Sequence, residues 1–299
     1  QNLQRMIANT RGLDRTESAN VAYFVVMAVV KDGEETKTAY RPKVVRALSD
    51  LDAAAMAREI VEEALSMLGA QPVESKTYPV LLRNTAAADL LETFAGIFHA
   101  ANGQKGKSLL TRDKVGQPLA SALVTIIDDP LMEGGMNCRS FDAEGVASRR
   151  LAVVEKGVLK SLLYNLKTAL VDGVEPTGHG SRSSYKAALS TASTNLYIEP
   201  GTRSLHEMAE SMGDGLVITD LQGLHSGANP ISGDFSLAAH GYLVEGGRIG
   251  RPVNQITVAG NFYDVLKNIV EVGNDMDRRD GLPFLSPTLW IRGLAVAGK

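Results

Sequence analysis

The C-terminal two-thirds of the chain is dominated by short apolar segments that alternate with a period of two. Most are closed by Gly, Asn or Pro, and in chain order they read SALVTIIDD, RRLAVVEKG, GVLKSLLYNL, TNLYIEPG, DGLVITDLQG, FSLAAHGYLVEGGRIG and NQITVAGN. This alternation is typical of half-buried strands, and the closing residues favour turns, one of them a hairpin turn at Lys156-Gly157. Two helical patterns interrupt these strands. One begins at Ser204, where Glu207 completes a capping box, and the other begins at Phe262. We therefore predict an α+β fold: a strand-rich domain with mixed or antiparallel sheets and a few helices.

A different organisation precedes this domain. The apolar run at 21–30 is followed by an Asp-Gly turn signal and by TKTAYRP, so a hairpin is expected. A helix should follow, with Ser49 and Asp52 as a capping box and Gly69 at its end. Because QPVESK is a polar joint, we divide the chain into two parts. Residues 1–72 are interpreted as the end of a small N-terminal or middle domain whose beginning is missing, and residues 77–299 as the strand-rich domain.

Composition excludes several classes of protein. With 44% hydrophobic and 22% charged residues among 299, the chain has the composition of a globular protein with a sizeable core. The formal charge of -3 predicts no direct binding to nucleic acid, and no apolar run is long enough to predict a membrane helix. Cys138 is the single cysteine, so no intrachain disulfide can form and a cytoplasmic location is expected.

Two polar loops, at 175–188 and 224–236, are rich in Gly and Ser and carry side chains that could donate hydrogen bonds to a peptide. Exposed loops that bind nothing are the alternative. Scattered His, Ser and Asp residues would also permit a catalytic triad, but spacing in sequence does not show its geometry. The candidate substrate-lining residues are His179, Arg182, Tyr185, His225 and Asn229.

Cys138 lies in the Gly-rich stretch GGMNCRSFDAEG. Arg139 beside it could lower the thiol pKa and make it a nucleophile. The alternative is a small residue used in packing, since no His lies close in sequence. Both interpretations stay open at this stage.

The segment LLETFAGIFHA is expected within one helix, from about Ala86 to Ala101. Glu92 and His99 are seven residues apart on about the same face. Two turns rise roughly 10.5 Å, too far for both side chains to close on one metal ion. His99 would then lie near the helix C-terminus, where a histidine can meet the last carbonyl groups.

The order of segments resembles the TldD/PmbA family. The resemblance is carried by YPVLLRNTAAADLLETFAGIFHA, DDPLMEGGMNCRSFDAEGVASRRLAVVEKGVLKSLLYNLKTA, NLYIEPG, SGDFSLAAHGYLVEGGRIGRPVNQITVAGNFYDVLKNIVEVGND and SPTLWIRGLAVAGK. It covers nearly the whole chain, most tightly from Tyr78 onward. This family is described as bacterial and archaeal peptidases and as a modulator of DNA gyrase, and its members pair as two related subunits, TldD and TldE (PmbA).

The resemblance implies that this chain lacks the family's zinc site. In the TldD branch this helix carries His, Glu and His, where the histidines bind zinc and the glutamate is the general base. Here Glu92, Thr93 and Ile97 stand at those positions, and the stretch at 277–287 lacks the branch's cysteine ligand. The resemblance therefore implies a TldE-type subunit with no metal or catalytic residue of its own. Its implied partners are a zinc-bearing TldD-type subunit and an unfolded peptide, with a homodimer when it is alone. The alternatives are a standalone protein-binding modulator of DNA gyrase, or a peptidase with a site unlike the family's.

Overall fold

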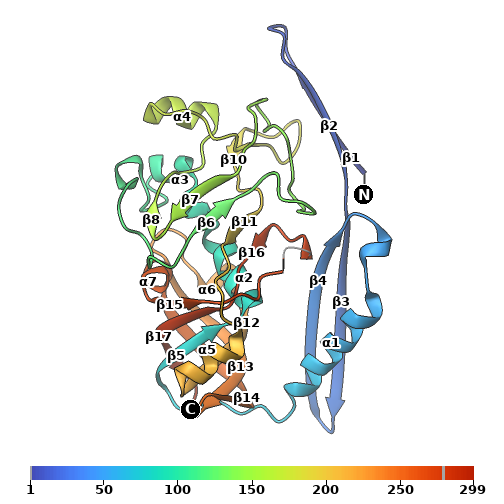
Figure 1. Cartoon of the computed structure of the whole chain (residues 1–299), viewed down its shortest axis with the longest axis vertical. Coiled ribbons are helices and arrows are strands. Elements are labelled where there is room, and N and C mark those ends of the chain that lie inside the picture. Colours follow the sequence, from blue (N-terminus) through green and yellow to red (C-terminus); the bar gives the residue numbers. More distant parts are fainter. Residues whose placement is uncertain (1, 278–279) are drawn as a thin grey trace.

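The computed structural model describes residues 2–277 and 280–299, which form two units joined by a linker at about 69–75. Figure 1 shows a slender N-terminal unit, made of β-hairpins and a helix, beside a larger C-terminal unit. The described helices are too short or too polar to cross a membrane. The predicted fold class is confirmed, because several mixed sheets with short helices make up the molecule.

Two consecutive hairpins and one helix build the N-terminal unit. β3 pairs with β4 from Ala22 opposite Val45 to Asp32 opposite Glu35, and Gly33 turns between them with a φ of +57°. The hairpin expected here is thus confirmed, whereas the hairpin that precedes it is not predicted by the sequence pattern. The elements are β1 (Asn2–Ala8), β2 (Asp14–Asn20), β3 (Ala22–Asp32), β4 (Glu35–Val45) and α1 (Ala53–Ser66).

The two faces of the β3–β4 hairpin differ. One face packs against α1 through a small core that is centred on Ile60. The other, which we call the outer face, exposes large apolar side chains because successive residues of a strand point to opposite sides. Its members, each between 50% and 63% exposed, are Tyr23, Val25, Met27, Val29 and Tyr40.

The start of α1 corrects one prediction. Asp52 is itself the N-cap, with its carboxylate accepting a hydrogen bond from the Ala55 amide at 2.9 Å. The box-like contact lies earlier, where the Asp50 carboxylate accepts from the Ala47 amide at 3.1 Å. The predicted Ser49–Asp52 box is therefore wrong, because a short 3-10 turn over Leu48–Asp50 precedes the helix.

A mixed sheet forms the base of the C-terminal unit. Its strand order is β14-β13-β12-β5-β17-β15, and an extra pairing between β14 and β17 closes five of the strands into a ring. β5 lies parallel to β12 and antiparallel to β17. The main core includes residues of this ring, of α2 and of strands outside the ring, and within it Phe94 of α2 stacks on Phe262 at 4.6 Å. The strands are β5 (Lys76–Leu82), β12 (Gly215–Gln222), β13 (Asp234–Glu245), β14 (Arg248–Asn261), β15 (Ile269–Val272) and β17 (Leu289–Ala297).

A second sheet of short strands lies above the first, in the order β16-β11-β6-β7-β8 (Figure 1). Its turn between β7 and β8 has positive φ at Lys156 and Gly157, which confirms the predicted hairpin. The strands are β6 (Ile126–Asp128), β7 (Leu151–Glu155), β8 (Val158–Leu159), β11 (Leu196–Ile198) and β16 (Phe284–Leu285), and a separate pair is β9 (Gly180–Ser181) and β10 (Ser190–Thr191).

The helices agree with the sequence in part. α5 begins at the predicted Ser204–Glu207 capping box, but the pattern from Phe262 is helical only to Lys267 and then becomes β15. The long helix expected over 86–101 is wrong, because His99 is extended between a 3-10 turn and α3. The helices are α2 (Asn84–Phe94), α3 (Ala100–Gln104), α4 (Leu166–Asp172), α5 (Leu205–Met212), α6 (Leu224–Gly227) and α7 (Phe262–Lys267).

The two units meet along what we call the seam, where ion pairs and hydrogen bonds lie beside apolar contacts: Val44 of β4 is 2% exposed and lies beside Gly281, and the Leu13 side chain lies beside Gly145. Arg83 at the start of α2 pairs with Glu63 of α1, and Lys43 of β4 pairs with Asp280 at 3.4 Å. Farther along, the Glu17 carboxylate accepts from the Ser140 hydroxyl at 2.7 Å. The apolar cluster under α1 stays separate from the main core.

Candidate functional site

The three altered motif positions lie in different surroundings. Glu92 is at the surface of α2, and partial burial of its carboxyl group raises its pKa. The Thr93 hydroxyl donates a hydrogen bond to the Asp89 carbonyl at 2.8 Å, and Ile97 is 1% exposed within the main core. Zinc prefers nitrogen, thiolate or carboxylate ligands. Since Ile97 has no donor atom and the Thr93 hydroxyl is used within its helix, these residues do not fit a zinc ion.

The rest of the family's metal stretch adds no ligand set. Arg278 and Arg279 of the stretch 277–287 lie outside the described residues. Among residues 2–277 and 280–299, no three His, Cys, Asp or Glu side chains come close enough to hold a metal ion.

Acidic groups gather instead beside α2. Burial, then the neighbouring Asp220 and Glu92 carboxylates, raise the pKa of Asp89 to about 6. Asp220 also faces His240 of β13, with 3.5 Å between the carboxylate Oδ2 and the imidazole Nδ1. This cluster lies where β12 and β13 approach Arg83, so it borders the seam.

His99 does not occupy the helix C-terminus expected for it. The residue sits at a break, where the Ala100 amide bonds to the Leu163 carbonyl at 3.0 Å. Its Nε2 lies 3.2 Å from the Ser193 hydroxyl. Burial, with a smaller effect from His179, lowers the pKa of His99 to about 4, so the imidazole is neutral at neutral pH.

His179, one of the candidate lining residues, is completely buried. Its Nε2 lies 3.0 Å from Asp128 Oδ1 and its Nδ1 lies 2.8 Å from the Thr177 hydroxyl. The other Asp128 oxygen accepts from the Thr194 amide at 2.8 Å. The geometry therefore gives His179 a structural task, which is to tie the end of β6 to the segments around β9 and β11.

The other four candidate lining residues are exposed. Arg182 and Tyr185 lie in the loop between β9 and β10, where Tyr185 is 86% exposed. His225 is on α6, and the Asn229 side chain accepts from the Ile231 amide at 3.0 Å within its own turn. No hydrogen bond or ion pair among the described residues joins these two loops. Their role in binding a peptide stays a prediction.

Cys138 is held in its own loop. Its thiol donates to the Met132 carbonyl at 2.7 Å, and burial raises its pKa despite the opposing charge of Arg46. A nucleophilic thiol needs a lowered pKa, so this environment favours the packing interpretation.

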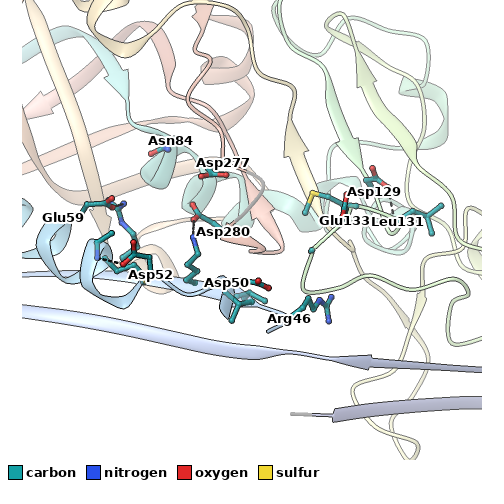
Figure 2. Close-up of a pocket in the computed structure, with 18 residues that line it drawn as sticks. Arg46, Asp50, Asp52, Glu59, Asn84, Asp129, Leu131, Glu133, Asp277 and Asp280 are labelled. Atoms are coloured by element: carbon teal, nitrogen blue, oxygen red, sulfur yellow. Dashed lines mark hydrogen bonds and ion pairs between the residues drawn. The ribbon is translucent and has the colours of Figure 1, made fainter. Parts of the chain in front are cut away.

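A cavity with a volume of about 940 Å³ runs between the two units (Figure 2). We call it the charged cleft. One wall is the end of β4 with the start of α1, and the other is made of the loop at 129–134 with Asp277, Asp280 and Asn84 of α2. Its charged lining residues are Arg41, Lys43, Arg46, Asp50, Asp52, Glu59, Asp129, Glu133, Asp277 and Asp280.

Most cations of the charged cleft are already paired. Arg41 binds Glu59 at 2.7 Å, and Arg46 donates to the Gly135 carbonyl. Burial raises the pKa of Asp280, while Lys43 lowers it. The cleft can therefore offer carboxylates and main-chain groups to a ligand more readily than free cations.

The sequence pattern does not predict the charged cleft, because its lining residues are spread over four separate stretches of the chain. The one local signal is the alternation of Arg41 and Lys43 along β4, which places two cations on the same side of a strand. None of Glu92, Thr93 and Ile97 lines the cleft. Only the first residue of their helix, Asn84, reaches it.

The fold defines a class: a two-unit α+β protein with a closed ring of strands and a second sheet above it. Residues 75–298 match the PmbA/TldA metallopeptidase C-terminal domain, and residues 2–68 match the central domain of the same family. The chain belongs to the PmbA/TldD family.

Named relatives agree with this assignment. Metalloprotease PmbA of Escherichia coli O157:H7 is 30% identical over 269 residues, which cover 89% of this chain and 57% of the relative. A TldD homologue, named a metalloprotease, from Buchnera aphidicola subsp. Acyrthosiphon pisum is 30% identical over 75% of this chain and 46% of its own. The chain thus spans roughly half the length of these relatives.

Solved structures show the same architecture. A Thermotoga maritima protein described as a candidate modulator of a DNA gyrase has a TM-score of 0.92 and 38% identity, over 99% of this chain and 67% of its own. TldE from Thermococcus kodakarensis has a TM-score of 0.88 and 25% identity, again over 99% and 67%.

Proposed function

We propose that this chain is the zinc-less subunit of a two-subunit metallopeptidase that acts on unfolded peptides. In this proposal a TldD-type subunit supplies the zinc and the general base. The observation that carries it is the state of the motif positions. Ile97 is in the core and the Thr93 hydroxyl is bonded to the Asp89 carbonyl, so neither replaces its family counterpart.

The charged cleft is the proposed contribution to peptide binding. β4 lines it and, within the described part of the chain, pairs on one side only, with β3. A free strand edge offers amide and carbonyl groups that can hold an extended peptide with little regard to its side chains. An unfolded peptide meets that requirement, whereas a folded protein does not.

The outer face of the β3–β4 hairpin supports the pairing of subunits. Met27 and Tyr40 lie opposite each other on it and are 62% and 54% exposed. Contiguous exposed apolar surface of this kind marks protein–protein contacts. A related subunit would cover it in the complex, and a second copy of this chain would cover it when the chain is alone. The proposal places both the complex and the homodimer in the cytoplasm, a reducing compartment in which a single unpaired cysteine is expected.

The second candidate function is a standalone modulator of DNA gyrase. The description of the Thermotoga maritima relative favours it. A peptidase with its own unrelated site has less support, because Cys138 has a raised pKa and His179 is buried.

Reconstitution tests the proposal. The chain is mixed with a zinc-bearing TldD-type subunit, and cleavage of a fluorogenic unfolded peptide is followed with and without chelator. We expect cleavage only in the mixture, loss of cleavage with chelator, and little effect of Thr93→Ala. Cleavage by this chain alone in the presence of chelator would exclude the proposal.

A matched pair of variants tests the surface. Met27→Asp, on the outer face, should prevent the two chains from co-eluting on size exclusion. Leu170→Asp, on α4 and 83% exposed, introduces the same charge elsewhere and should leave co-elution intact. Equal behaviour of the two variants would place the contact somewhere other than the outer face.

A further inference from the structure

Leu131 is the main exposed apolar side chain among the described residues that line the charged cleft. The residue is 59% exposed, whereas the other large apolar residues of the lining, Val44, Val45, Met56 and Met132, are each at most 6% exposed. Figure 2 shows Leu131 on the loop that forms one wall of the cleft. An apolar group of a ligand that enters the cleft can therefore gain hydrophobic free energy mainly by covering Leu131.

The loop at 129–134 holds Leu131 in this position. The Leu131 amide donates to the Asp129 carboxylate at 3.0 Å, and the Met132 amide donates to the Asp129 carbonyl at 3.3 Å. The Asn195 side chain donates to the same carbonyl at 2.8 Å and so ties the loop to the start of β11. A side chain on a fixed loop needs little ordering when a ligand covers it, so less of the binding free energy is lost.

Glu133 places a carboxylate two residues from Leu131. Glu133 is exposed, and its side chain makes no hydrogen bond or ion pair with any residue of 2–277 or 280–299. The three cations that line the described part of the cleft, in contrast, already contact a carboxylate or a carbonyl group of the protein. A basic side chain of a ligand can thus reach a carboxylate without displacing a partner, whereas an acidic side chain must compete for its cation.

The free edge of β4 does not itself select among peptides. A peptide that pairs with this edge is held through its main chain, and such contacts are nearly independent of its side chains. The loop at 129–134 lines the same cavity as β4, so the side chains of a peptide held there lie within its reach. Selection among unfolded peptides therefore depends on the wall that carries Leu131 and Glu133.

We propose that the charged cleft selects unfolded peptides in which an apolar residue and a basic residue lie close together in the sequence. Leu131 covers the apolar side chain, and the Glu133 carboxylate accepts from the ammonium or guanidinium group of the basic one. The inference rests on the proposed function, because it takes the cleft as the peptide site. It adds the class of peptide that is bound, which the free strand edge alone does not determine.

Three labelled peptides test this selection on the purified full chain alone, with chelator present and without the partner subunit. They share a Gly-Ser sequence and differ at two positions, which hold Leu and Lys, Ser and Lys, or Leu and Glu, and their binding is followed by fluorescence anisotropy. We expect the Leu–Lys peptide to bind at least about fivefold more tightly than either of the others, which is roughly 1 kcal/mol. Equal affinity for the three peptides, or no binding of any of them, would overturn the proposal. Loss of selection with cleavage by the reconstituted mixture intact would leave the proposed function standing, and selective binding without cleavage in the mixture would contradict only the proposed function.

Two variants assign the selection to this wall. Leu131→Ser should make the affinities for the Leu–Lys and Ser–Lys peptides equal within about twofold, and Glu133→Lys should reverse the preference for Leu–Lys over Leu–Glu. The ratio of two affinities measured on one protein does not change when part of that protein is unfolded. The controls are Leu123→Ser, at a residue that is 53% exposed, and Glu175→Lys, at an exposed glutamate; neither residue lines the cleft, and both variants should keep the wild-type ratios. Wild-type ratios in both Leu131→Ser and Glu133→Lys would refute the site.

Discussion

Replacing Asp128 by Asn distinguishes a structural from a ligand-binding role for His179. The Asp128 carboxylate is fully buried and accepts from His179 Nε2 at 3.0 Å and from the Thr194 amide at 2.8 Å. The Thr194 hydroxyl is a third donor to it. An asparagine keeps one acceptor oxygen but puts an NH2 group where the other oxygen was. With the amide oxygen toward the Thr194 amide, the NH2 group faces His179 Nε2 and the Thr194 hydroxyl, so the imidazole must take its other tautomer and the hydroxyl must turn.

The expected loss follows from these contacts. A hydrogen bond to a charged group contributes about 1.5–3 kcal/mol, and a buried donor left unsatisfied costs about 1–3 kcal/mol. Asp128→Asn removes the charge that these donors meet and should therefore lower the free energy of unfolding by about 1.5–3 kcal/mol. Were His179 merely a residue that lines a binding site, the same change would cost little stability and would act on ligand binding instead.

Urea unfolding followed by tryptophan fluorescence measures this loss. Trp290 is the only tryptophan, and it lies on β17 in the same unit. Asp129→Asn is the control, because the Asp129 side chain accepts from the Leu131 amide within its own loop and an amide oxygen can do the same. We expect a change below about 1 kcal/mol for the control. A loss below about 1 kcal/mol in Asp128→Asn as well would refute the structural role argued for His179.

Three further predictions concern stability and chemistry. Because the folded-state pKa of Asp89 is raised from 3.8 to about 6, its proton stabilises the fold below pH ~4, and this stability is lost as pH rises through 6. In urea unfolding, the free energy of unfolding of the wild type should fall by up to about 3 kcal/mol between pH ~4 and ~7 relative to that of Asp89→Asn. Gly241→Ala puts a Cβ 1.8 Å from the Val217 carbonyl and should cost about 3 kcal/mol or more by the same assay, whereas Gly250→Ala, with 3.6 Å to its nearest atom, should cost under about 1 kcal/mol. Cys138→Ser should leave the cleavage rate of the reconstituted complex within about twofold, and a hundredfold drop would restore the thiol as a nucleophile.

Local signals predicted the elements they control. The Ser204–Glu207 box begins α5, and Gly33 turns the β3–β4 hairpin, because both depend on contacts within a few residues. The helix over 86–101 failed for the opposite reason. The break at His99 is made by hydrogen bonds to Leu163, which is far away in the sequence. The helical spacing of apolar residues continues through the break, so the sequence pattern does not predict it.

The candidate site was less predictable than the fold. The motif positions at Thr93 and Ile97 were located by the resemblance to the family, which aligns a continuous stretch of the chain. The charged cleft could not be predicted from the sequence, since β4 and the loop containing Asp129 meet only when the two units are placed side by side. His179 shows the converse error. A polar residue in a Gly-rich stretch suggested an exposed loop, yet Asp128 provides a partner that allows its burial.

Separation of the two units and unfolding of either unit should differ in their changes in heat capacity, because the seam and the cores differ in composition. Arg83–Glu63 and Lys43–Asp280 are partly exposed ion pairs, and the two apolar clusters do not merge across the seam. Turning one unit away from the other would hydrate these charges and the few apolar side chains at the seam, so it should change the heat capacity less than melting a core does. Melting either unit exposes its own core and should raise the heat capacity steeply. Added salt screens the ion pairs and should lower the free energy needed to separate the two units. We therefore expect ionic strength to affect mainly the contact between the two units beside the charged cleft, and temperature to affect mainly the folding of each unit.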